Sequence, residues 1–129
     1  MADVPVPDEA ESLIADARLS VHVATSVDDR PHVAPVWYLY DDSVLSFVTS
    51  GRKLRNVREN SRVALSIEKT DERGVDWTVT MQGTATVFDD PERVEPVQRR
   101  IDEKYDNETD YGFQPLVEVE IASASYTVY

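Results

Sequence analysis

SVLSFVTSGRKLRNVRENSRVALSIEK, residues 43–69, decides how this chain folds. Residues 43–49 are rich in alternating apolar side chains and predict a strand. Residues 50–60 carry apolar side chains on one helical face and basic side chains on another, which predicts a short amphipathic helix. Residues 61–69 alternate between apolar and polar again. The stretch therefore predicts a strand, a helix and a second strand.

The turn between the first strand and the helix reads Thr49-Ser50-Gly51-Arg52-Lys53. The first amides of a helix have no internal acceptor, and the helix dipole adds positive charge there. Two hydroxyls and two cations lie beside those amides, so the turn predicts a site for an anion such as a phosphate ester. The alternative is an ordinary helix start that Ser50 caps, with solvated cations. The turn lacks the phosphate-loop pattern of nucleoside triphosphatases.

Acidic residues dominate the composition. The 129 residues include 25 Asp and Glu against 13 Lys and Arg, a formal net charge of −12, and no Cys. The length predicts one domain, residues 1–129. No apolar run is long enough to cross a bilayer, and we expect a cytoplasmic protein. The acidic excess is typical of halophilic proteins, and it argues against nucleic acid as a partner. Five of the 13 cations nevertheless fall within residues 52–62, which favours a specific anionic ligand there.

The remaining chain predicts more strands than helices. Residues 1–7 are expected to form a flexible arm. Helices are expected at residues 9–17, capped by Asp8, and from Asp90-Pro91 to about Tyr105. Further strands are predicted at residues 19–26, 32–40, 75–88 and 116–121, with residues 125–129 continuing the sheet. Gly83 predicts a bulge or a tight bend in the strand at residues 75–88. Six short strands with few crossover helices predict a mainly β fold with an antiparallel sheet, closed as a small barrel.

Three segments carry a resemblance to a known family. They are Arg30–Trp37 (RPHVAPVW), Phe47–Lys53 (FVTSGRK) with its continuation Asn60–Leu65 (NSRVAL), and Val79–Ala85 (VTMQGTA). In this order and spacing, the chain resembles the FMN-binding split barrels related to pyridoxamine 5′-phosphate oxidase, over roughly Leu13–Ile121. The resemblance implies a six-stranded antiparallel split β-barrel that forms a homodimer, with a flavin at the interface.

The resemblance also implies which residues bind the cofactor, FMN. In such proteins an Arg-Lys pair after the third strand holds the phosphate, neighbouring hydroxyls bind phosphate or ribityl, and second-strand residues border the isoalloxazine ring. The long strand of the partner subunit adds a polar residue. The matching positions are Arg52 and Lys53, then Thr49 and Ser50, then Val36 and Trp37, and finally Thr78 for the partner's strand.

Two departures from the vitamin oxidases concern the substrate. Those enzymes carry an Arg and a Lys where this chain has Ala34 and Leu39, and in them the Lys binds the substrate phosphate. We therefore expect a flavin-dependent oxidoreductase acting on an unknown small molecule, and not a true pyridoxamine phosphate oxidase. The hydride chemistry would belong to the cofactor, and the sequence assigns no catalytic residue.

Two alternatives stay open. One is a reductase that uses the deazaflavin F420, whose acidic tail Arg55 and Arg58 could bind. The other is a non-catalytic protein that binds flavin or haem. No metal site is expected, because the sequence shows no cluster of ligands and the two histidines, His22 and His32, lie singly on strands. Tyr105, Tyr111 and Phe113 flank a loop that is expected to close the core, with a position over the site as the alternative.

Overall fold

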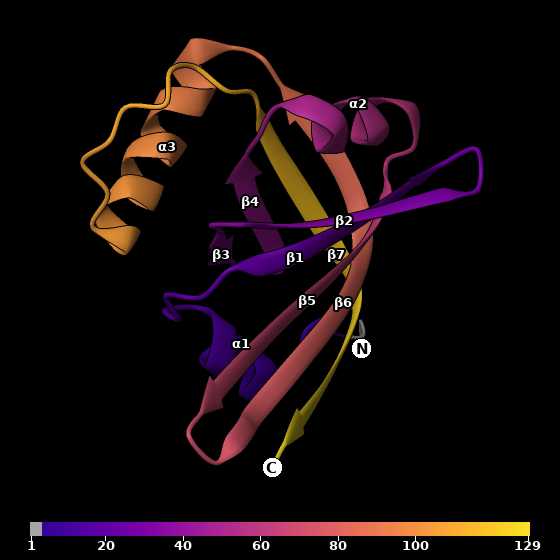
Figure 1. Cartoon of the computed structure of the whole chain (residues 1–129), viewed down its shortest axis with the longest axis vertical. Coiled ribbons are helices and arrows are strands. Elements are labelled where there is room, and N and C mark those ends of the chain that lie inside the picture. Colours follow the sequence, from indigo (N-terminus) through magenta and orange to yellow (C-terminus); the bar gives the residue numbers. More distant parts are fainter. Residues whose placement is uncertain (1–3) are drawn as a thin grey trace.

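A strongly twisted, antiparallel seven-stranded sheet forms the body of the protein, as described by a computed structural model of residues 4–129 (Figure 1). The three helices are α1 (Asp8–Ile14), α2 (Gly51–Glu59) and α3 (Pro91–Tyr105). The strands are β1 (Val21–Val27), β2 (Arg30–Val36), β3 (Leu39–Asp41), β4 (Val44–Val48), β5 (Arg62–Asp71), β6 (Gly74–Phe88) and β7 (Leu116–Val128). Their order across the sheet is β2-β1-β5-β6-β7-β4-β3. The expected mainly β, antiparallel fold is confirmed.

The segment at residues 32–40 differs from the prediction of a single strand. It divides at Trp37 and Tyr38 into β2 and β3, which lie at opposite edges of the sheet, so the strands number seven rather than six. The twist of the sheet brings its two edges near each other, and two residues suffice to cross between them. Pro35 lies on the edge strand β2, where the missing N–H costs no ladder hydrogen bond with a second neighbour.

The core lies between the inner face of the sheet and the helices. Every second residue is buried from Val63 to Ile67 in β5 and from Trp77 to Ala85 in β6, as a sheet with one covered face requires. The largest fully buried side chains come from the strands, the crossover and two helices: Tyr38, Phe47, Ile14, Leu45, Leu65, Ile67, Ile101 and Leu116. Most of these side chains form one cluster with residues of the strands, α1 and α2, whereas Ile101 and Leu116 are buried outside it.

Gly83 marks the predicted irregularity in β6. The pairing of β6 with β7 shifts register between Gln82 and Gly83, so the expected bulge is confirmed. A Cβ atom added at Gly83 would lie 2.4 Å from the carbonyl oxygen of Glu120 and 2.8 Å from a methyl of Val119. The two backbones approach so closely here that only glycine fits.

The segment before α1 is anchored in the core. Val6 is fully buried, so the expectation of a flexible arm is wrong at that position, while residues 1–3 lie outside the described part of the chain. The helix starts after Pro7 and ends at Ile14, three residues earlier than expected. Tyr38 donates a hydrogen bond to the Ile14 carbonyl at 2.6 Å, and Tyr40 donates to Glu11 at 2.5 Å. Within residues 4–129, no helix has the length and apolar character that crossing a membrane requires.

Candidate functional site

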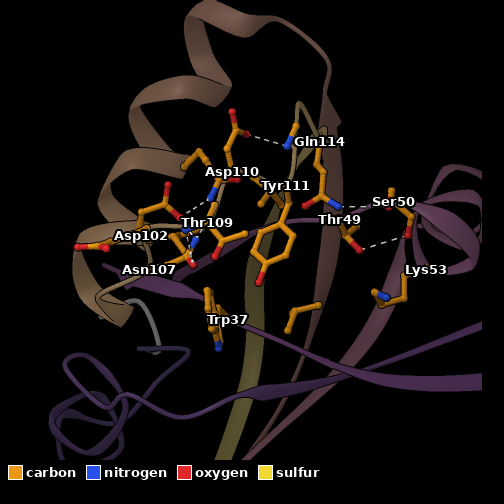
Figure 2. Close-up of a pocket in the computed structure, with 16 residues that line it drawn as sticks. Trp37, Thr49, Ser50, Lys53, Asp102, Asn107, Thr109, Asp110, Tyr111 and Gln114 are labelled. Carbon is orange, nitrogen blue, oxygen red and sulfur yellow. Dashed lines mark hydrogen bonds between the residues drawn. The ribbon is translucent and has the colours of Figure 1, made fainter.

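A cavity of about 370 Å³ opens between the start of α2, the crossover from β2 to β3, and α3 with the loop that follows it (Figure 2). One wall contains five of the seven residues predicted to bind the cofactor: Val36, Trp37, Thr49, Ser50 and Lys53. Thr49 is buried, Lys53 is half-buried and Ser50 is exposed. Residues that are distant in sequence thus meet at one hollow.

The other two predicted residues lie elsewhere in the subunit. Arg52 is exposed on the first turn of α2 and does not line the cavity. Thr78 lies on β6 opposite Glu68 of β5 and Thr127 of β7. Its neighbours in sequence, Trp77 and Val79, are buried in the core, so Thr78 faces the outer side of the sheet. Within one subunit the structure therefore does not bring Thr78 to this cavity.

The first turn of α2 has no side-chain cap. Ser50 occupies the N-cap position in an extended conformation, but its hydroxyl makes no capping hydrogen bond, and no acidic residue lies in the first turn. The Ser50 Oγ instead accepts a hydrogen bond from the Gln114 amide at 3.2 Å. Gly51 has a φ of +73°, which a residue with a Cβ adopts only with strain. The first amides of α2 therefore have no side-chain partner in the described residues.

The opposite wall comes from α3 and residues 107–114, a loop for which the sequence favoured closure of the core over a position at the site. Asp102 on α3 accepts hydrogen bonds at 3.0 Å from both Gln98 and Asn107. Asn107 accepts one from the Thr109 amide at 3.1 Å, and Asp110 one from the Gly112 amide at 2.8 Å. Side chains that bond to backbone two residues ahead build defined turns, so this loop has a fixed shape. Its Asn and Asp residues are the sequence signal for that shape.

Tyr111 and Phe113 lie in this loop, and the expectation that they close the core is wrong. The side chain of Tyr111 is 70% exposed and that of Phe113 is 55% exposed, so neither closes the core. Tyr111 lines the cavity, and Figure 2 shows its ring on the side of the hollow facing Trp37. The loop therefore contributes to the wall of the cavity rather than to the core.

Trp37 packs against the last turn of α3. Its indole stacks on the ring of Tyr105, with centroids 4.9 Å apart and planes inclined by 9°. The Lys104 ammonium lies 3.8 Å from the centre of the Tyr38 ring and donates a hydrogen bond to the Tyr38 carbonyl at 2.9 Å. Burial lowers the pKa of Lys104 to about 8, although the Asp16 carboxylate opposes that shift. Burial also raises the pKa of Tyr105, against the effect of its hydrogen bond with the Tyr38 backbone.

The charges in the cavity are separated. Lys53 lies at the α2 side, whereas Asp102, Glu108 and Asp110 lie on the wall formed by α3 and its loop. Val36 and Trp37 supply apolar surface between them. The arrangement fits a ligand that has an anionic group at the start of α2 and a flat apolar ring against Trp37. Residues 4–129 contain no group of three or more His, Asp or Glu side chains that could hold a metal ion.

A second hollow lies on the outer face of the sheet, across β2, β1, β5, β6 and β7. A shallow hollow of about 330 Å³ is lined there by His22, Ala24, Val33, Ala64, Leu65, Ser66, Thr80, Met81, Gln82 and Ser125. None of these described residues is Asp, Glu, Lys or Arg, although such residues make up 29% of the chain. A hollow lined only by uncharged side chains on so acidic a protein is suited to contact with another protein surface.

Solved structures with the same fold include several flavin-related proteins. An F420 reductase is 26% identical, with a TM-score of 0.76 over 93% of this chain and 98% of its own. A FAD-binding protein from Mesorhizobium loti is 19% identical, with a TM-score of 0.74 over 94% of each chain. The flavocytochrome Anf3 from Azotobacter vinelandii is 16% identical, with a TM-score of 0.70 over 95% of this chain and 67% of its own. No curated protein sequence matches significantly.

The family comparison covers nearly the whole chain. The family model described as pyridoxamine 5′-phosphate oxidase matches residues 7–128. The match includes all three segments that carried the resemblance, and the shared architecture confirms the expected split-barrel type of fold. The protein belongs to the pyridoxamine 5′-phosphate oxidase family.

Proposed function

We propose that the protein is an FMN-binding oxidoreductase that acts on a small molecule. The observation that carries the proposal is the uncapped start of α2, where Ser50 and Lys53 line the cavity. In this arrangement the backbone amides and the Lys53 ammonium bind the phosphate, and the Ser50 hydroxyl adds a hydrogen bond. Val36 and Trp37 border the isoalloxazine ring. FMN supplies the hydride chemistry when bound, and the residues of the chain bind and orient it.

Arg52 has a secondary role in this proposal. Its side chain is exposed and lies outside the cavity lining, so it contributes long-range attraction and reaches the phosphate from the solvent side. Exposed charges are screened by salt, whereas partly buried ones are screened less. The contribution of Arg52 to FMN affinity should therefore fade in high salt, and that of Lys53 should persist.

The proposal includes a homodimer. The hollow on the outer face supports it, because its lining residues carry no charge and two copies of a chain with a net charge of −12 associate most readily where their carboxylates are kept apart. Thr78 faces the same side and is proposed to reach the flavin of the partner subunit. Ala64→Glu places a carboxylate in the middle of this face and should yield monomers with reduced FMN affinity in sedimentation and titration experiments. A dimeric variant with unchanged affinity would exclude this interface.

The phosphate site can be tested by measuring the affinities of the wild-type protein and of a Lys53 variant for both FMN and riboflavin. FMN and riboflavin differ by the phosphate, and Lys53→Met removes the proposed partner of that phosphate. A hydrogen bond between charged groups contributes about 1.5–3 kcal/mol, so the variant should bind FMN about 10- to 100-fold more weakly and riboflavin with little change. Lys69→Met, on the exposed end of β5, is the matched control and should bind both ligands normally.

The outcomes separate the candidate functions. Equal weakening of FMN and riboflavin by Lys53→Met would contradict the phosphate site. Absence of FMN binding in the folded wild-type protein would refute the proposal. Bound FMN that neither reduced nicotinamides nor redox dyes reduce would favour the non-catalytic alternative.

A second candidate is an F420-dependent reductase, which the likeness to an F420 reductase at 26% identity favours. Arg55 is exposed and available to an acidic tail, but Arg58 already forms an ion pair with Asp89 at 2.7 Å. Saturable binding of F420 in the absence of FMN binding would select this candidate. Arg55→Met should then weaken F420 and leave FMN unaffected.

A further inference from the structure

The crossover from β2 to β3 consists of Trp37 and Tyr38. Residues in the last turn of α3 contact both of them. Tyr105 stacks on the Trp37 indole, and its hydroxyl accepts a hydrogen bond from the Tyr38 amide at 3.3 Å. Lys104 donates to the Tyr38 carbonyl at 2.9 Å and lies over the Tyr38 ring. Two adjacent helix residues thus hold two adjacent crossover residues.

Tyr105 is itself held on both sides. Its hydroxyl donates a hydrogen bond to the Leu19 carbonyl at 2.6 Å, in the segment that leads into β1. Arg18, in the same segment, donates from Nε to the Lys104 carbonyl at 2.6 Å. The tyrosine ring is therefore fixed at its hydroxyl end by Leu19 and Tyr38, and at its backbone end by the helix. A ring fixed at both ends cannot turn away from the indole.

The two faces of Trp37 have different surroundings. Tyr105 covers one face at 4.9 Å. The side chain is nevertheless 38% exposed and lines the cavity, so the exposed surface belongs to the opposite face and the ring edge. Figure 2 shows the indole at the floor of the hollow, with Tyr111 above it. The open face of the indole is the flat apolar surface that an aromatic ligand ring can stack on.

We propose that Tyr105 is a positioning residue, which fixes the plane of the Trp37 indole so that its open face receives the flat ring of the ligand. The inference rests on the proposed flavin function and deepens it. Binding to a surface that is already ordered avoids the entropy cost of ordering it during association. Without Tyr105, the indole is free to rotate about its side-chain torsions and to fill part of the cavity.

The test uses variants in a Trp77→Phe background, which leaves Trp37 as the only tryptophan because the chain contains two. Tyr105→Phe keeps the stack and removes both hydrogen bonds of the hydroxyl. Tyr105→Leu removes the stack as well. The control is Val94→Ala, which weakens the packing of α3 at a buried residue outside the cavity lining.

The first readout needs no flavin. The near-ultraviolet circular dichroism of Trp37 and its quenching by acrylamide report how firmly the indole is held. Tyr105→Leu should lose most of the tryptophan dichroism and become more accessible to acrylamide, with Tyr105→Phe in between. Val94→Ala should resemble the parent protein. Unchanged Trp37 signals in Tyr105→Leu would overturn the inference.

The second readout is the affinity for the ring of the ligand. Tyr105→Leu should weaken riboflavin and FMN by the same factor, about 3- to 10-fold, which corresponds to the loss of one aromatic stacking interaction. This pattern differs from that of Lys53→Met, which should affect FMN alone. Riboflavin affinity equal to that of Val94→Ala would overturn the inference even if the dichroism changes.

The two proposals fail in different ways. If the parent protein binds neither FMN nor riboflavin, the proposed function is wrong and the ligand part of this inference is overturned with it. If the parent binds both and the Tyr105 variants bind both equally well, only the positioning role is wrong.

Discussion

Gly83→Ala should destabilise the fold severely, because the new methyl has no space. Its Cβ would lie 2.4 Å from the Glu120 carbonyl oxygen and 2.8 Å from a methyl of Val119, whereas non-bonded atoms of this kind settle at about 3.5 Å. The carbonyl cannot retreat, since β7 is paired with β6 on one side and with β4 on the other. The backbone of Glu120 is held further by the Ile121 amide, which donates to the Ser43 carbonyl at 2.9 Å.

The cost follows from this confinement. Forcing an extra carbon into packed structure costs about 1–3 kcal/mol, and the short contact with backbone places Gly83→Ala at the upper end. For a domain of this length a loss of about 3 kcal/mol lowers the melting temperature by about 10 °C. The assay is thermal and urea unfolding, with Thr84→Ala as the control, because that neighbour is exposed. A melting temperature of Gly83→Ala within about 2 °C of wild type would refute the reasoning.

Three further predictions concern buried polar groups. Asn56→Ala leaves the buried Thr25 hydroxyl without the hydrogen bond it accepts at 3.0 Å, so the free energy of unfolding should fall by about 1–3 kcal/mol; a urea midpoint equal to that of wild type would contradict this. Burial raises the pKa of Tyr40 to about 12 and that of Tyr38 also above its usual value. The folded state then keeps phenol protons that the unfolded state releases above pH 10, and stability should decline from pH 10 to 12; urea midpoints across that range test it, and Tyr40→Phe should decline less. Lys104 should change stability with pH in the opposite direction. Its pKa of about 8 in the folded state lies below the value of 10.5 for a free lysine, so the folded state loses this proton at a lower pH than the unfolded state. Stability should therefore rise from pH 8 towards 10. Nuclear magnetic resonance of the Lys104 side chain should show a midpoint near 8, and a midpoint above 10 would disprove the burial argument.

Local sequence signals predicted the parts of the fold that depend on local chemistry. Asp90 and Pro91 start α3 as expected, with Asp90 accepting a hydrogen bond from the Glu92 amide at 3.1 Å. The turn Thr49–Lys53 lies where one strand enters α2, and the register shift falls at Gly83. Caps, turns and bulges depend on a few adjacent residues, and such features can be inferred from the sequence.

The features that the sequence did not predict depend on contacts between segments that are distant in the chain. Residues 32–40 are mostly β-branched, apolar and aromatic, and Pro35 indicates an edge strand or a bulge rather than a break at Trp37 and Tyr38. The break arises because the two edges of the twisted sheet approach each other. For the same reason, the sequence favoured closure of the core for the loop after α3 and did not assign its residues to the site. Only the folded chain brings Asp102 and Tyr111 opposite Lys53.

The crossover at Trp37 and Tyr38 also dictates an order of folding. β1 and β2, like β5 and β6, are hairpins of neighbouring strands, whereas β4 pairs with β7 through residues as distant as Leu45 and Val119. Because closing a long loop costs more entropy than closing a hairpin, the hairpins form early and the β4–β7 pairing forms late. The contacts of α3 with Trp37 and Tyr38 can form only when both edge strands of the sheet, β2 and β3, are in place. The cavity is consequently assembled last, and in pulsed hydrogen exchange the amide of Tyr38 should gain protection after those of β5 and β6.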